Sequence, residues 1–207
     1  MTEQFEAAIT AYTGARHAIA VNSATSALHL SMLATGITEN NCVWTTPNTF
    51  VSTANAARMC GATVRFIDID PGTLNLCPQA LSSALHKAAK TNELPQAIVF
   101  VHFAGNPTGF SDVAKIAEAY GIPVIEDGSH ALGSSISSVP VGSCTQSQAT
   151  VFSFHAVKPV TAGEGGIITT NDDQFAETVR LLRSHGVTRN PKQFKNPSQA
   201  TSLPRWY

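Results

Sequence analysis

The chain has 207 residues, which is long enough to bury a substantial hydrophobic core as one large domain. Hydrophobic residues make up 43% of it and charged residues only 13%, and this balance excludes intrinsic disorder. The formal net charge of -1 provides neither the basic footprint of a nucleic-acid-binding protein nor a polybasic membrane anchor, and no apolar run approaches the roughly 20 residues of a membrane span.

The N-terminal stretch MTEQFEAAIT is acidic and amphipathic and lacks the basic start and apolar core of a signal peptide. The cysteines Cys42, Cys60, Cys77 and Cys144 are far apart and form no C-x-x-C pair. This spacing suits neither a zinc site nor a disulfide framework, so we expect buried, reduced thiols. We predict a cytoplasmic protein without a metal site.

Helical and β-branched segments alternate along the chain. The segments with a helical pattern are, in order, 4–12, 23–34, 51–60, 78–89, 111–120 and 174–184. The strand candidates are 18–21, 43–45, 63–67, 97–101, 123–126, 149–154 and 166–170. Such alternation is typical of an α/β fold, in which helices flank a mainly parallel sheet.

The last two strand candidates are joined by a short loop, so one of them could run antiparallel to its neighbours. After His185 the pattern ends in a polar, proline-bearing stretch. We therefore assign residues 1–186 to one large domain and residues 187–207 to a tail that leads into a further part.

Two residues at predicted strand ends carry the main chemical signal. Asp127 closes the apolar strand in IPVIEDGSHALG, where a buried carboxylate needs a cation or a strong donor. Lys158 lies in TVFSFHAVKPVTAGEGG, between an aromatic strand and a glycine-rich turn. A lysine with a disfavoured ammonium form and an acid that can face a pyridinium nitrogen are what pyridoxal phosphate (PLP) requires. Taken singly, Asp127 could cap a helix or form an ion pair, and Lys158 could be a surface lysine.

The segment VNSATSALHL passes directly from a strand into a helix through small hydroxyl residues. A helix N-terminus favours phosphate, and the hydroxyls of Thr25 and Ser26 could add donors. The alternative is that Ser23 or Thr25 only caps the helix. Ser153, in the strand before Lys158, is a further candidate phosphate donor, or else a core serine bonded to the backbone.

A planar cofactor also needs side chains on its two faces. Phe50, in TTPNTFVST, could stack on one ring face, and His130, three positions after Asp127, could cover the other. Each has an ordinary alternative, because most phenylalanines belong to the core and a strand-end histidine is often structural.

Together these motifs resemble the sugar aminotransferases of the DegT/DnrJ/EryC1/StrS family, which have the aspartate-aminotransferase (PLP-dependent transferase type I) fold. The resemblance runs from FEAAITAYTGARHAIAVNSATSALHL to LLRSHG, and FSFHxxKxxxxGEGG is its most specific part. It implies that Lys158 forms the Schiff base and that Asp127 pairs with the pyridine nitrogen. It further implies cofactor-binding roles for Phe50, His130, Ser153, Thr25 and, through its backbone amide, Ala24.

The resemblance also implies an activity: transfer of an amino group, with L-glutamate as donor, to a UDP-4-keto-6-deoxy amino sugar by a homodimer. A UDP-4-amino-4-deoxy-L-arabinose type of enzyme is the near alternative. Family members are nearly twice this length and continue into a G-[YF]-N-[YF]-R segment and a small C-terminal domain. The chain is therefore expected to be a fragment that lacks that domain.

Three other interpretations of these motifs make different demands on the sequence. A PLP-dependent sugar dehydratase of the same family would have histidine in place of Lys158. The second interpretation is non-catalytic: the chain would be an inactive fragment that only binds PLP or assembles with partners. A nucleotide-binding doubly wound domain would need a phosphate-loop fingerprint, and the sequence contains none.

Overall fold

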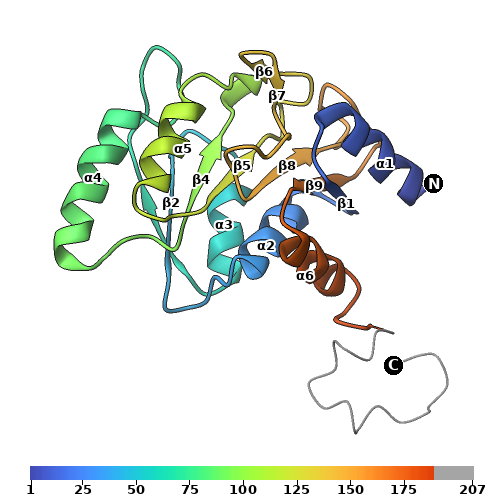
Figure 1. Cartoon of the computed structure of the whole chain (residues 1–207), viewed down its shortest axis with the longest axis horizontal. Coiled ribbons are helices and arrows are strands. Elements are labelled where there is room, and N and C mark those ends of the chain that lie inside the picture. The colour runs from blue at the N-terminus through green and yellow to red at the C-terminus, as the bar shows by residue number, and fades with distance from the viewer. Residues whose placement is uncertain (189–207) are drawn as a thin grey trace, which may run out of the picture.

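The computed structural model describes residues 1–188, which form a sheet covered by helices on both faces (Figure 1). The helices are α1 Thr2–Thr13, α2 Ala24–Ala34, α3 Ser52–Met59, α4 Pro78–Thr91, α5 Phe110–Glu118 and α6 Asp173–Arg183, with a short 3-10 turn η1 at Phe103–Gly105. The strands of the large sheet are β1 His17–Val21, β2 Cys42–Thr45, β3 Thr63–Phe66, β4 Ala97–Val101, β5 Val124–Asp127, β8 Ala149–Ser153 and β9 Gly166–Thr170. The predicted segments are confirmed to within a few residues at each end.

The seven strands are ordered β1-β9-β8-β5-β4-β2-β3. β9 pairs antiparallel with both β1 and β8, whereas the pairs from β8 to β3 are parallel. The prediction that one of the last two strands runs antiparallel is confirmed for β9. Because β4, β5 and β8 run parallel, their carboxyl ends meet at one edge, where ligands gather in such sheets.

Alternating side chains of β4 face two separate cores, as expected for a strand buried on both faces. Ala97 and Val99 pack with α2, α3 and α6, and Ile98 and Phe100 pack with α4 and α5. A third cluster lies under α1, where Ile9 packs with Phe152 and Phe154. Figure 1 shows α2, α3 and α6 side by side on one side of the strands.

A two-stranded hairpin of β6 Ser135–Ile136 and β7 Val139–Pro140 was not predicted. Its turn residues Ser137 and Ser138 have φ of 48° and 68°, the left-handed conformation that a tight hairpin turn requires. Serine seldom adopts that conformation, so this pair carries no turn signal of the Asn-Gly kind.

The expectation of buried thiols is wrong for three of the four cysteines, although all four are free of disulfides. Cys42, Cys60 and Cys77 are half-buried and lie near the ends of their elements. Cys144 is buried, and burial together with the nearby Glu126 carboxylate raises the pKa of its thiol to about 11. It therefore stays protonated at neutral pH.

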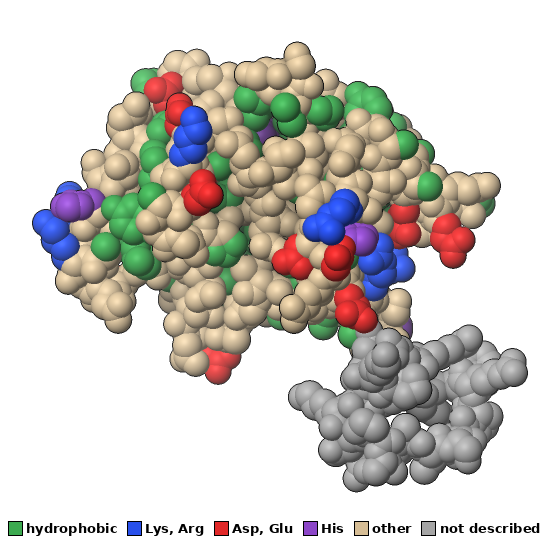
Figure 2. Space-filling model, viewed as in Figure 1, with side chains coloured by type: hydrophobic (Ala, Val, Ile, Leu, Met, Phe, Trp, Pro, Cys, Tyr) green, Lys and Arg blue, Asp and Glu red, His purple; other side chains and the backbone are tan. Residues whose placement is uncertain are grey.

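Side chains of both charge signs are mixed on the face shown in Figure 2, most densely around α6. Arg16 and His17 both contact the Asp173 carboxylate there, and Arg183 contacts Glu6. Within residues 1–188 no helix combines the length and the apolarity needed to cross a bilayer. Most of the predicted tail, from residue 189 on, lies outside the described residues.

Candidate active site

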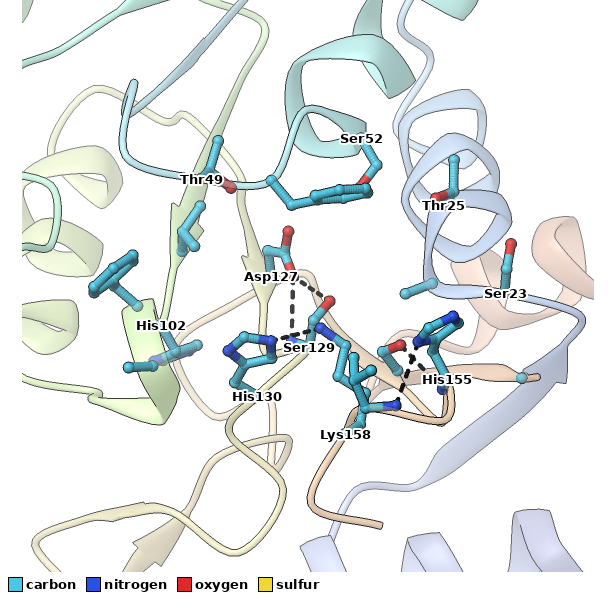
Figure 3. Close-up of a pocket in the computed structure, with 18 of the residues that line it drawn as sticks. Ser23, Thr25, Thr49, Ser52, His102, Asp127, Ser129, His130, His155 and Lys158 are labelled. Atoms are coloured by element: carbon cyan, nitrogen blue, oxygen red, sulfur yellow. Dashed lines mark hydrogen bonds between the residues drawn. The ribbon is translucent and has the colours of Figure 1, made fainter. Parts of the chain in front are cut away.

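One cavity of about 430 Å³ opens at the carboxyl ends of β4, β5 and β8. Every predicted site residue lines it: Ala24, Thr25, Phe50, Asp127, His130, Ser153 and Lys158. These residues come from four separate stretches of the chain, 24–25, 50, 127–130 and 153–158, so the sheet topology is what brings them together. Figure 3 shows several of them pointing into the same space.

The Asp127 carboxylate is buried at the end of β5 and is held from two sides. Ser129 donates to Oδ1 through its Oγ at 2.6 Å and its backbone amide at 3.2 Å. Thr53 donates to Oδ2 from its Oγ1 at 2.7 Å. The Thr53 hydroxyl has only one proton, so its 2.7 Å contact with Thr49 must be accepted from the Thr49 hydroxyl. The carboxylate is thereby fixed in one orientation.

Sequence reasoning missed Thr53, Thr49 and Ser129. The local sequence could have indicated Ser129, because an aspartate carboxylate commonly accepts a hydrogen bond from the residue two positions later in a turn. Thr53 is 74 positions away from Asp127, so only the packing of α3 beside β5 brings them into contact. Nothing in the local sequence around Thr53 indicates this role.

Lys158 lies in the loop after β8, half-buried, with its Nζ 2.5 Å from Nε2 of His130 (Figure 3). Burial lowers the pKa of Lys158, and the Asp127 carboxylate opposes that effect. Burial also lowers the pKa of His130, and the positive charge of Lys158 lowers it further. The amine is thus poised nearer to its neutral, nucleophilic form than an ordinary lysine.

The N-terminus of α2 forms another wall of the cavity. Ser23 caps the helix, with its Oγ accepting from the amide of Ser26 at 3.1 Å, as in the capping alternative. Thr25 lines the cavity instead of capping, and while the Ser26 and Ala27 amides donate to Ser23, those of Ala24 and Thr25 precede the first hydrogen bond of the helix and have no partner within it. This end of the cavity therefore offers N–H donors and the positive end of a helix dipole to an anion.

Gly166 explains how the helix start comes so close to β9. A Cβ at this position would lie 2.4 Å from the carbonyl carbon of Ser23, closer than any side chain can approach. The last glycine of the GEGG run thus lets the α2 N-terminus pack directly on the sheet.

The other predicted residues occupy the rim and floor. Ser153 is buried, and its Oγ accepts weakly from the amide of His155 at 3.4 Å. Phe50 lines the cavity while 74% of it is exposed, so a ring face is left for a ligand to cover. His155 and Glu164, which sequence reasoning did not select, form a 3.6 Å pair that also lines the cavity.

Comparison with known proteins identifies relatives over most of the chain. The model of the DegT/DnrJ/EryC1/StrS aminotransferase family matches residues 1–201. The UDP-4-amino-4,6-dideoxy-N-acetyl-beta-L-altrosamine transaminase of Campylobacter jejuni is 43% identical over 186 residues, which are 90% of this chain and 48% of the relative. The chain thus spans about half the length of the curated relatives it matches.

Solved structures agree with the fold. Helicobacter pylori PseC, an aminotransferase involved in the biosynthesis of pseudoaminic acid, superposes with a TM-score of 0.82 at 37% identity, covering 91% of this chain and 49% of that one. NtdA from Bacillus subtilis, solved with bound cofactor PMP, superposes with a TM-score of 0.76 at 26% identity, covering 87% of this chain and 39% of that one.

Proposed function

Because the chain belongs to the DegT/DnrJ/EryC1/StrS aminotransferase family, we propose that its protein is a PLP-dependent aminotransferase acting on a nucleotide sugar. The observation that carries the proposal is one cavity lined by an amine of lowered pKa, a fixed carboxylate and a helix N-terminus. These three groups match the aldehyde, the pyridine nitrogen and the phosphate of PLP.

The residues of the cavity fit that cofactor. The α2 N-terminus with Thr25 and Ser153 would hold the phosphate. The Asp127 oxygens accept three hydrogen bonds from protein groups, which leaves acceptor capacity because a carboxylate offers about four lone-pair sites. The exposed ring of Phe50 and the imidazole of His130 would flank the pyridine ring. Lys158 would provide the amine for covalent attachment.

PLP, when bound, supplies an aldehyde carbon and a ring that takes up electrons. Lys158 Nζ would hold that carbon until the amine of the donor takes the place of Nζ. Free Nζ would then accept a proton from the carbon that bears the donor's amine and return it as a general acid. Asp127 would keep a proton on the ring nitrogen, and its fixed orientation avoids reorganisation during the reaction.

We propose a UDP-4-keto-6-deoxy amino sugar as substrate, L-glutamate as donor and a homodimer as the working assembly, in the cytoplasm. The name of the Campylobacter jejuni relative and the role given for PseC support this sugar class and a part in pseudaminic acid biosynthesis. A UDP-4-amino-4-deoxy-L-arabinose type of substrate is the near alternative. We also propose that the PLP-binding domain consists of residues 1–186 and that residues 187–207 form a tail.

The test is covalent capture of PLP followed by an activity assay. The chain is mixed with PLP, reduced with borohydride and digested, and the modified lysine is identified by mass spectrometry. We expect the adduct on Lys158 and its loss in Lys158→Ala. Adducts spread over the other lysines, and unchanged in Lys158→Ala, would refute the cofactor assignment.

Amine transfer from glutamate to a UDP-4-keto sugar then tests the reaction. The same assay on residues 1–207 and on the full-length protein separates an active enzyme from a fragment that only binds PLP. Both lengths are assayed because the chain spans about half the length of the relatives it matches. PLP capture without amine transfer by the full-length protein would favour a binding role.

A further inference from the structure

The 2.5 Å contact between Lys158 Nζ and His130 Nε2 brings a second titratable nitrogen to the proposed attachment atom. A flanking role against the cofactor ring does not require this contact. Two nitrogens at hydrogen-bond distance can share a proton only if at least one of them is unprotonated. The contact therefore bears on when the lysine amine becomes free to react.

We propose that His130 is the proton acceptor of Lys158 and takes the ammonium proton before Nζ bonds to an aldehyde carbon. In this step the N–H bond at Nζ breaks, its electron pair remains on Nζ, and a new N–H bond forms at Nε2. The inference rests on the proposed function, because the aldehyde is that of PLP. It assigns His130 a catalytic role beside its position against the ring.

The turn that carries His130 is held in place by its backbone contacts, although the side chain itself is exposed. The amide of Ala131 donates to the carbonyl of Gly128 at 2.8 Å, which closes the turn that carries His130. A Cβ at Gly105 would lie 2.7 Å from the His130 carbonyl oxygen, so the loop after β4 packs directly on this turn. Ser134 adds a 2.6 Å hydrogen bond from its Oγ to the Gly105 carbonyl. A fixed turn presents the imidazole from the same position, and its contact with the Lys158 amine is the one that orients the ring.

The surrounding charges favour one proton on the pair. Burial disfavours the cationic form of each partner, and the positive charge of Lys158 lowers the pKa of His130. Asp127 raises the pKa of both and so offsets the imidazolium charge after transfer. The carboxylate that stabilises the positive charge on either residue is thus the one that Thr53 and Ser129 hold in place.

The other ionisable groups that line this cavity are His102, His155 and Glu164. The Nε2 of His102 is engaged with the Glu126 carboxylate at 2.7 Å, and its ring packs against Phe100 and Phe110. His155 is paired with Glu164 at 3.6 Å. Among residues 1–188, His130 is therefore the side chain within hydrogen-bond distance of the Lys158 amine.

The matched variant is His130→Gln, because a glutamine keeps a hydrogen-bond acceptor but cannot take up a proton. Attachment to Lys158 is followed by borohydride quenching and peptide mass spectrometry between about pH 6 and 9, a range that spans the ordinary His pKa and approaches that of Lys. One series uses PLP, and a second uses formaldehyde with cyanoborohydride, which needs no phosphate site. The exposed Lys90 is the internal reference in every sample.

We expect His130→Gln to slow attachment at Lys158 about a hundredfold near neutral pH with both aldehydes, at the lower end of general acid–base effects. The deficit should shrink as the pH rises and the amine loses its proton to solvent, and the rate at Lys90 should not change. Equal rates for wild type and His130→Gln at every pH would overturn the proposal.

The two series also separate this inference from the proposed function. If PLP shows no preference for Lys158 in the wild-type chain, the proposed function fails. If PLP attaches at Lys158 but His130→Gln has no effect with either aldehyde, only the proton-acceptor role fails.

Discussion

Thr53 donates a hydrogen bond from its Oγ1 to Oδ2 of Asp127 over 2.7 Å, joining the first turn of α3 to the end of β5. Both residues are buried, so this bond operates away from water, where a hydrogen bond to a charged group is strongest. It makes the orientation of the proposed pyridine partner depend on α3, a helix that is far from β5 in sequence but packs beside its end.

The first prediction concerns this bond. Thr53→Val keeps the shape of the side chain but removes the donor, and a hydrogen bond to a charged group contributes about 1.5–3 kcal/mol. We expect PLP to bind on the order of tenfold or more weakly, as measured by fluorescence titration. Thr53→Ser restores a hydroxyl and should recover most of the affinity. Equal affinities for the wild type and the valine variant would show that Thr53 does not support the site.

A second prediction follows from Gly166. An added Cβ would meet the backbone of Ser23 and Ala24 at 2.4–2.6 Å, and backbone cannot turn aside as a flexible side chain can. Gly166→Ala should therefore push the α2 N-terminus away from β9, at a cost of about 1–3 kcal/mol. Urea unfolding measures the loss of stability, and binding of pyridoxal phosphate relative to pyridoxal measures the loss of the phosphate contribution.

The neighbouring Gly165 offers the control for that experiment. A Cβ there would meet the Phe154 Cβ at 3.4 Å, which is close to ordinary contact. Gly165→Ala should leave stability within about 1 kcal/mol of the wild type. If the two alanine variants behave alike, close packing of the helix start on Gly166 is not the cause.

The third prediction concerns the buried polar network behind Asp127. Glu126 accepts from Ser147 at 2.5 Å and from Thr150 at 2.7 Å, and it contacts His102 at 2.7 Å. These contacts join the ends of β4 and β5 to the start of β8. Glu126→Ala would leave buried partners unsatisfied, and each such group costs about 1–3 kcal/mol. We expect a large drop in unfolding free energy by urea titration.

An exposed carboxylate provides the comparison for Glu126. Glu164 also contacts a histidine, but its side chain is 69% exposed and the pair is 3.6 Å apart. Glu164→Ala should change stability by less than about 1 kcal/mol, as exposed pairs usually do. A similar loss in both variants would contradict the importance of burial.

The fourth prediction concerns acid stability. The pKa of Asp172 lies below its ordinary value of 3.8, first because the amide of Phe175 donates to it at the start of α6 and then because Gln148 does. A lowered folded-state pKa contributes stability above the unfolded value, and this contribution is lost as the pH falls through the folded value.

Asp172→Ala should therefore reduce stability by about 1 kcal/mol at neutral pH, as loss of an N-cap does. The difference from the wild type should narrow below about pH 4, where the aspartate becomes protonated. Asp172→Asn keeps the cap without the titration, so it should remain close to the wild type at neutral pH. Urea unfolding at several pH values checks all three proteins, and a gap that stays constant down to low pH would exclude this contribution.

The sequence by itself determined the succession of helices and strands, because hydrophobic periodicity and β-branched runs are local properties. It also located Asp127 and Lys158, since a carboxylate and an amine that follow apolar strands are costly unless they are used. The antiparallel course of β9 was foreseen as an option, because a short loop cannot carry a parallel crossover.

Only the tertiary structure decided which distant residues meet. The contacts of Thr53 with Asp127, of Gly166 with Ser23 and of Lys158 with His130 depend on strand order and helix packing, which local pattern does not specify. The β6–β7 hairpin depends on two serines in a left-handed conformation that surrounding packing must stabilise. The chemistry of the site can thus be read from single residues, whereas its geometry arises from the sheet, which brings four separate segments to one edge.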